Sequence, residues 1–528
     1  MRGAPSGRGA RRFVVILGLV ILVGAVAAAA TSATTPAEVV APADLAQAAA
    51  DGRAAGERPA TGGTQILRET ESGNVLEVIE DPPSLSAEPV TTEPAPENLG
   101  FWAGEISPTL YLSVGGMDLA GDAAADAVAT GRRTVYVAGY VAALGRDLSL
   151  VKYVDGVEAW TRIYDAPAHG SDEARAVAAK GTAIYTAGQR QSKAGDFDLL
   201  LIRWDRGGER VWTRAYDSGS RQFDGAYDVA VDGDGNVTVI GTSVSTAGGS
   251  DWVVISYRAD GTRRWVARYD GPAHLTDEAA RMVLDSAGNV YVVGYSGSAA
   301  NGDDALVVKY SKSGARLWAR RYNGEGNGLD EAYSLRARPG GGVYVAGITY
   351  RPTTGYDGLL LAYNAAGTRL FMAAATGGWS TDISETQAFL DLEVLPGGDI
   401  LCGGYDARYA DGYAMDRYRV QYSPAGDPWL FAWEFSGDAW NEWITDLAKD
   451  AQGGAYVTGT LATSSTSSQI YTQRICAGGT GWRSKWPTTP TWKDEPAAIA
   501  VNGVNAYIVG RHYVTATDYD QALLGYVY

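Results

Sequence analysis

Two series of carboxylates recur along the chain at similar intervals. Members of the first open an expected strand, and members of the second open another strand two further on: Asp172 and Glu173, Asp224, Asp277 and Glu278, Asp330 and Glu331 in the first series, and Asp198, Asp251, Asp304 and Asp357 in the second. Carboxylates gathered in one place raise one another's pKa or recruit cations, and Ca²⁺ accepts roughly six to eight oxygen ligands. Alternatively, each Asp accepts hydrogen bonds from backbone amides at a strand entrance.

The repetition itself helps to choose between these interpretations. A catalytic centre needs one unique arrangement, whereas these carboxylates keep the symmetry of the repeat, which favours the structural role. We therefore expect no catalytic residue in either series. They remain candidate ligand-binding or cation-binding residues, with Ca²⁺ as the one candidate ion and the metal site otherwise unknown. His169 and His274 occupy equivalent positions in the segments DAPAHGSDE and DGPAHLTDE, which indicates a loop role.

The unit that positions these residues is clearest between Tyr227 and Tyr269. Four runs of alternating apolar and polar residues are separated by turn residues, a pattern typical of short antiparallel strands. We name the expected strands a to d in chain order: 227–232, 237–241, 251–257 and 264–269. If the strands form an up-and-down meander, strands a and c begin at the same end of the sheet, so both carboxylate series should line one loop face.

Two markers count the units. A glycine ending strand b occurs eight times, with spacings of 49 to 57 residues: Gly139, Gly188, Gly241, Gly294, Gly347, Gly404, Gly459 and Gly510. An aromatic residue opening strand d occurs only seven times, because the last unit stops after its strand c: Trp160, Trp212, Trp265, Trp318, Phe371, Phe431 and Trp482. Since an unpaired edge strand is a hazard, Leu110–Leu112 around Tyr111 should supply the missing strand. The sequence predicts an all-β, eight-bladed β-propeller of four-stranded antiparallel blades, closed by an N-terminal strand; the alternative is seven-bladed.

The repeat also resembles a known family. Leu284–Ser296 (LDSAGNVYVVGYS) and Asp304–Gly314 (DALVVKYSKSG) look like the bacterial SBBP type of β-propeller repeat. The resemblance covers essentially residues 101–528. It implies an exported or cell-surface propeller with a binding role, and it implies no catalytic motif.

The N-terminal region predicts delivery out of the cytoplasm. Arginines precede the uncharged run Phe13–Ala30, so we expect residues 1–33 to be a signal peptide or an N-terminal membrane anchor. Residues 34–100 are rich in Ala, Pro and Thr and should form a disordered tether, apart from an isolated strand at Val75–Ile79. Residues 101–528 form the expected propeller. The predicted location is secreted or anchored at the cell surface.

Composition limits the partners. The net charge of −17 and the pI near 4.7 argue against a nucleic-acid partner, because a phosphate backbone requires a basic surface. We expect a monomer that binds a protein or a cell-surface glycan. Cys402 and Cys476 either form one disulfide or are two unrelated thiols, and the sequence leaves both open.

Two functions follow. The first is a non-enzymatic binding module that acts through the acidic loop face, with the aromatics between Tyr405 and Tyr418, and Trp440 and Trp443, as candidate stacking contacts. The alternative is a secreted polysaccharide hydrolase or lyase in a central funnel. It needs two carboxylates that escape the repeat, for which Glu434 and Asp438 are the candidates.

Overall fold

The computed structural model describes 16 segments of the chain: residues 64–70, 73–78, 110–114, 118–127, 133–141, 146–245, 249–299, 302–375, 386–408, 414–434, 441–464, 467–476, 479–487, 493–503, 505–513 and 519–526. The chain divides into two compact units, residues 1–62 and 63–528, and every described element belongs to the second. The expected signal or anchor lies outside the described residues. Within the described part, no helix is long and apolar enough to cross a membrane.

All described elements are strands, and most belong to four-stranded antiparallel groups that we number sheets 1 to 8. The first four sheets are built as follows: sheet 1, β4 (Asp118–Ala127), β5 (Arg133–Val141), β6 (Asp147–Val154) and β7 (Val157–Asp165); sheet 2, β8 (Asp172–Lys180), β9 (Ala183–Gln191), β10 (Phe197–Asp205) and β11 (Arg210–Tyr216); sheet 3, β12 (Asp224–Val231), β13 (Val237–Val244), β14 (Ser250–Tyr257) and β15 (Arg263–Tyr269); sheet 4, β16 (Asp277–Leu284), β17 (Val290–Ser298), β18 (Gly302–Tyr310) and β19 (Arg316–Tyr322).

The remaining sheets follow the same order: sheet 5, β20 (Glu331–Ala337), β21 (Val343–Arg351), β22 (Gly355–Tyr363) and β23 (Arg369–Ala375); sheet 6, β24 (Thr386–Val394), β25 (Ile400–Arg408), β26 (Ala414–Tyr422) and β27 (Pro428–Glu434); sheet 7, β28 (Glu442–Lys449), β29 (Ala455–Ala462), β30 (Ser468–Cys476) and β31 (Gly479–Trp486); sheet 8, β32 (Asp494–Asn502), β33 (Asn505–Tyr513), β34 (Tyr519–Tyr526) and β3 (Leu110–Val114). A single parallel bridge between Tyr356 and Thr386 joins sheets 5 and 6.

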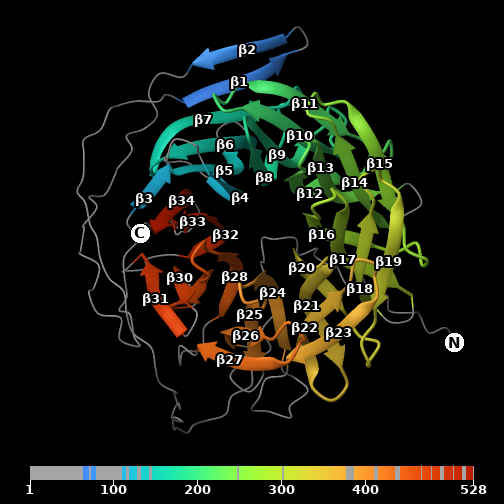
Figure 1. Cartoon of the computed structure of the whole chain (residues 1–528). Coiled ribbons are helices and arrows are strands. Elements are labelled where there is room, and N and C mark those ends of the chain that lie inside the picture. The colour runs from blue at the N-terminus through green and yellow to red at the C-terminus, as the bar shows by residue number, and fades with distance from the viewer. Residues whose placement is uncertain are drawn as a thin grey trace, which may run out of the picture. The chain divides into compact units, whose positions relative to one another are not determined.

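The sheets follow one another in chain order, and each presents its first strand to its neighbour (Figure 1). Thus β4 contacts β8, β8 contacts β12, and the series continues to β28 with β32; β32 also contacts β4. Buried apolar clusters fill the spaces between adjacent sheets, for example the cluster that contains Trp212 of sheet 2 and Val239 of sheet 3. This is a propeller-like, all-β fold, as the alternating pattern predicted.

A bulge in the first strand of every sheet explains the glycine that marks the repeat. The register of β16 against β17 shifts between Ala279 and Arg281, and corresponding shifts occur in the other seven sheets. The bulge brings a carbonyl oxygen onto the second strand, where a Cβ at Gly294 would lie 1.9 Å from the Glu278 oxygen. Glycine is therefore required at this point because no side chain fits.

The aromatic residue of the fourth strand links each sheet to the next. The Trp318 indole N–H donates to the Ala365 carbonyl in sheet 5 at 3.1 Å, and the ring packs between Tyr291 of its own sheet and Tyr363 of the next. Trp160, Trp212 and Trp265 donate in the same way to the next sheet. The aromatic residue that marks the fourth strand in the sequence therefore packs between neighbouring sheets.

Aspartates at the bulge make a second link between sheets, one that sequence reasoning did not find. Asp228 accepts the Met282 backbone N–H of the next sheet at 2.8 Å, and Asp446 accepts that of Ile499 at 2.8 Å. Asp391 accepts the Leu447 N–H at 2.9 Å. Much of the acidic composition is therefore used inside the fold.

Two strands lie within the segment expected to be a tether. β1 (Thr64–Thr70) and β2 (Gly73–Val78) form an antiparallel hairpin, and β1 pairs in parallel with β7. The strand expected at Val75–Ile79 is therefore not isolated, and the tether does not include these two strands. β3 pairs antiparallel with β34, with Tyr111 opposite Leu524.

Candidate functional site

Aspartates that open the first strands fasten the loops that precede them. In four successive loops the carboxylate accepts the backbone N–H of the residue six positions earlier, at 2.6 to 2.7 Å: Ala166 to Asp172, Ser218 to Asp224, Gly271 to Asp277 and Gly324 to Asp330. This is the backbone-capping role that repetition favoured. It holds the four loops in equivalent positions beside the sheets.

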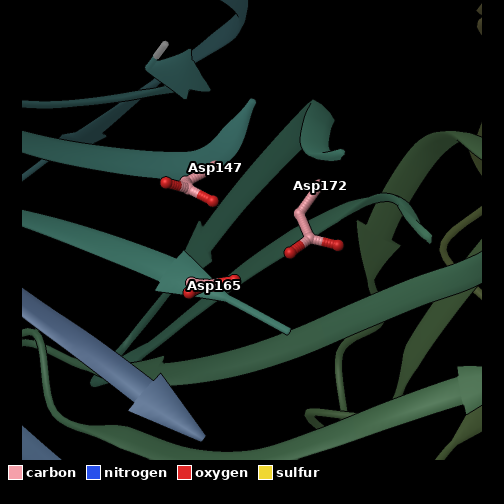
Figure 2. Close-up of side chains that lie close together, drawn as sticks. All are labelled: Asp147, Asp165 and Asp172. Atoms are coloured by element: carbon pink, nitrogen blue, oxygen red, sulfur yellow. The ribbon is translucent and has the colours of Figure 1, made fainter. Parts of the chain in front are cut away.

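Carboxylates that open a first strand and a third strand come together where sheets 1 and 2 meet. Asp172 opens β8, Asp147 opens β6, and Asp165 ends β7; one carboxylate oxygen of each lies within 4.8 Å of the other two. Figure 2 shows the three carboxyl groups gathered at these strand ends. Burial, and then the negative charges of Asp165 and Asp147, raise the pKa of Asp172 to about 7, against the lowering effect of its backbone hydrogen bonds.

An equivalent cluster forms where sheets 3 and 4 meet, from Asp251, Asp270 and Asp277. Burial raises the pKa of Asp277 to about 6, although hydrogen bonds from Ser296 and Gly271 lower it, and Asp251 and Asp270 raise it further. Three carboxylates this close are suited to share a proton or to coordinate a hard cation such as Ca²⁺.

Sequence reasoning missed the third member of each cluster. Asp165 and Asp270 each follow the last tyrosine of a fourth strand, a position outside both carboxylate series. The recurring pair Tyr-Asp at 164–165, 216–217 and 269–270 was the signal that could have identified them.

A histidine accompanies the carboxylates at both clusters. His169 Nδ1 lies 2.7 Å from Asp165 Oδ2, and His274 Nδ1 lies 2.7 Å from Asp270 Oδ2. Both histidines have a positive φ near 50°, in the left-handed region. Arg221 and Asn327 take the same conformation at the equivalent positions of the two other loops, so loop geometry is shared while the chemistry differs.

Three carboxylates near the start of a third strand face an arginine. Asp198 pairs with Arg190 at 3.3 Å, Asp304 with Arg321 at 2.8 Å, and Asp357 with Arg351 at 2.5 Å. Burial raises the pKa of Asp198, Asp251 and Asp304 in each case. The second series is therefore not a uniform ring of free acids, because these ion pairs neutralise three of its members.

The glutamates of the first series have different partners. Glu173 pairs with Arg175 at 2.7 Å, and Glu331 accepts a hydrogen bond from the Tyr333 hydroxyl at 2.8 Å. Glu278 is buried, and burial raises its pKa to about 7, with Tyr295 donating a hydrogen bond and Asp303 adding a like charge.

Other candidates from the sequence have mixed outcomes. Tyr418 was expected among the stacking contacts, but it is fully buried and stacks on Phe389 at 5.8 Å, so it belongs to the core. Tyr405 and Trp443 are partly buried, while Trp440 and Asp438 lie outside the described residues, as does the side chain of Glu434. Cys402 is a free, buried thiol in β25, so the disulfide alternative is wrong.

A surface pocket of about 510 Å³ adjoins the second cluster. Its wall on one side is the loop after β15, with Asp270 and His274, and on the other side the beginning of β19, with Arg316 and Leu317. We call these four residues the rim pocket. It combines acidic, basic and apolar groups in a volume suited to a small organic ligand.

Among the comparisons with known proteins, only the one with solved structures found similarity to this chain. Neither a protein-family model nor a curated protein matches the chain. Solved structures with detectable similarity include a protein described as a gluconolactonase (13% identity, 53% of this chain and 86% of that chain, TM-score 0.27). Others are puromycin hydrolase (15%, 66% and 51%, TM-score 0.37) and a protein of unknown function from Dyadobacter fermentans (12%, 65% and 95%, TM-score 0.34). These TM-scores are all below 0.5, and nothing about activity follows from them.

Proposed function

We propose that the chain is an exported or surface-tethered β-propeller of the SBBP type, with eight blades closed by β3. Three features support closure: β32 contacts β4, Val137 of sheet 1 and Val509 of sheet 8 share one buried cluster, and β3 pairs with the last strand. A seven-bladed ring would leave one of the eight four-stranded groups unused.

Its role is non-enzymatic binding through the acidic loop face, with a protein or a cell-surface glycan as partner. The observation that carries this role is the repeated cap from Asp172, Asp224, Asp277 and Asp330, which presents four loops in equivalent geometry. An array of equivalent loops suits contact with an extended partner, whereas catalysis requires one distinct centre.

Ca²⁺ is the candidate ion on this face. The clusters around Asp172 and Asp277 each offer three carboxylates within 4.8 Å, and oxygen ligands of this kind match the preference of Ca²⁺. Calcium bound at these loops would stiffen the same surface that contacts the partner.

The test compares the full chain with a loop-face variant, Asp165→Asn, Asp217→Asn and Asp270→Asn, for co-sedimentation with purified cell-wall material. These three aspartates each follow the last tyrosine of a fourth strand, and the variant leaves the capping aspartates intact. Loss of co-sedimentation with an unchanged melting temperature is the expected result, and equal sedimentation of both proteins would contradict the proposal. Release of reducing ends from the same material would instead favour the hydrolase or lyase alternative, with a site in the central funnel.

A further inference from the structure

The rim pocket holds unused hydrogen-bonding capacity. The Arg316 guanidinium lies over the Tyr269 ring, 5.6 Å from its centroid, and among the described residues it makes no hydrogen bond or ion pair. A guanidinium offers five N–H donors, so those of Arg316 remain available to a ligand. Across the pocket, Asp270 and His274 form their hydrogen-bonded pair with 43% and 76% of their side chains exposed.

Apolar surface completes the pocket. Leu317 is 52% exposed, which is unusual for a leucine in a strand, and Pro272 lies on the loop side. The charges of Arg316 and Asp270 are opposite, so together they exclude neither a positively charged nor a negatively charged ligand. A ligand that fits must offer both donors and acceptors on one edge and an apolar face on the other.

We propose that the rim pocket binds an uncharged sugar residue of a glycan. Each sugar hydroxyl both donates and accepts, which matches a carboxylate, an imidazole and a guanidinium placed around one space. The C–H face of a pyranose ring supplies the apolar surface for Leu317. The pocket, about 510 Å³, is also larger than a free amino acid zwitterion needs, although the paired charges alone would accept one.

A related arrangement occurs where sheets 1 and 2 meet. Arg210 lies over the Tyr164 ring at 5.4 Å and also donates to Thr213 Oγ1 at 3.3 Å. Asp165 pairs with His169, although only 5% of the Asp165 side chain is exposed, and Val211 is 47% exposed. This junction is therefore a second, less open candidate sugar site, and one long glycan that occupies both sites gains avidity without any new contact.

The neighbouring junction of sheets 4 and 5 provides a natural control. Arg369 lies over the Tyr322 ring at 5.5 Å, and Leu370 is 46% exposed, so this half of the constellation is present. The loop, however, carries Asn323 and Asn327, hydrogen-bonded to each other at 3.0 Å, in place of the Asp-His pair. A change at Arg369 removes the same cation–π contact but no complete site.

The experiment measures binding of the full chain to immobilised cellohexaose, chitohexaose and mannohexaose by surface plasmon resonance. Methionine keeps the aliphatic stem of arginine, so the variants are Arg316→Met, Arg210→Met, the double variant and the control Arg369→Met. Wild type should bind at least one hexasaccharide. Each single variant at a complete site should lose affinity by about 100-fold through lost avidity, the double variant should not bind, and Arg369→Met should bind as wild type does.

Three outcomes would overturn the inference. They are binding of none of the hexasaccharides by wild type, an effect of Arg369→Met equal to that of Arg316→Met, and competition by free leucine as strong as by free hexasaccharide. The inference rests on the proposed binding function, and the two can fail separately. If the double variant keeps co-sedimentation with cell walls while Asp165→Asn, Asp217→Asn and Asp270→Asn lose it, the loop face binds a partner and the sugar sites are wrong.

Discussion

At the scale of single residues, the aspartates that open the first strands make the same hydrogen bond in equivalent positions but have different neighbours. Asp172 and Asp224 make the same capping bond, yet Asp172 also faces Asp165 and Asp147 within a buried cluster. A buried carboxyl group surrounded by like charges is more easily protonated. Its protonation therefore links stability to pH.

This link gives a prediction with a definite sign. The pKa of Asp172 is about 7 in the folded state and about 3.9 when unfolded, so between these values only the folded chain holds the proton. Its contribution to stability is complete below about pH 4 and is lost as pH rises to about 7, with a slope of up to about 1.4 kcal/mol per pH unit. Asp172→Asn, whose amide oxygen still accepts the Ala166 N–H, should remove that slope in urea unfolding measured from pH 4 to 8.

Asp277 serves as the comparison for this measurement. The pKa of Asp277 is about 6 in the folded state. Asp277→Asn should therefore change the pH dependence of the free energy of unfolding in the same direction as Asp172→Asn does, but the change should end about one pH unit lower. Parallel curves for wild type and Asp172→Asn would contradict the prediction.

At the scale of elements, two kinds of constraint specify the repeat. Local steric constraints, such as the bulge glycines, can be recognised in the sequence, whereas side-chain contacts between sheets cannot. Glycines such as Gly294 could be counted from the sequence because the bulge admits no other residue. Turn residues and alternation located the four strands of each unit for the same local reasons. The partner of an acidic side chain depends on which strand ends meet in space, so the Asp165 and Asp270 clusters and the links from Asp228 and Asp446 could not be derived from spacing.

The bulge predicts a severe effect of the smallest substitution. In Gly294→Ala the new methyl group would lie 1.9 Å from the Glu278 carbonyl oxygen, so two backbones must separate. We expect a loss of about 3 kcal/mol in the free energy of unfolding, measured with urea. Gly233→Ala is the control, because nothing lies within 4 Å of a Cβ there. A cost at Gly294 no larger than at Gly233 would refute the steric explanation.

The tryptophan link predicts a graded effect. Trp318→Phe should keep the ring between Tyr291 and Tyr363 but lose the hydrogen bond to the Ala365 carbonyl, at a cost of about 1 kcal/mol. Phe371 holds this place in sheet 5, so the fold accommodates phenylalanine. Trp318→Ala should cost about 3 to 5 kcal/mol, because it leaves a cavity between sheets. Equal losses for the two variants in urea titrations would show that the hydrogen bond, not the ring, supplies the stability.

At the scale of the whole molecule, the proposed closure depends on β3, which lies far in sequence from its partner strand β34. β3 gives β34 its outer neighbour, and an unpaired edge would invite association with other chains. A chain that begins at Thr109 keeps β3, whereas one that begins at Gly116 lacks it. The shorter chain should melt several degrees lower and associate in sedimentation experiments, and identical behaviour of the two would count against closure by β3.

The pairing of β3 with β34 also constrains the order of folding. Links such as that from Trp318 to Ala365 join residues 47 positions apart, so each can form soon after the next sheet is synthesised. Tyr111 and Leu524, by contrast, meet only after the last strand has emerged, and ordering so long a loop is slow. Until then the nascent chain has two uncovered edges, and a chaperone that covers them would act during that interval.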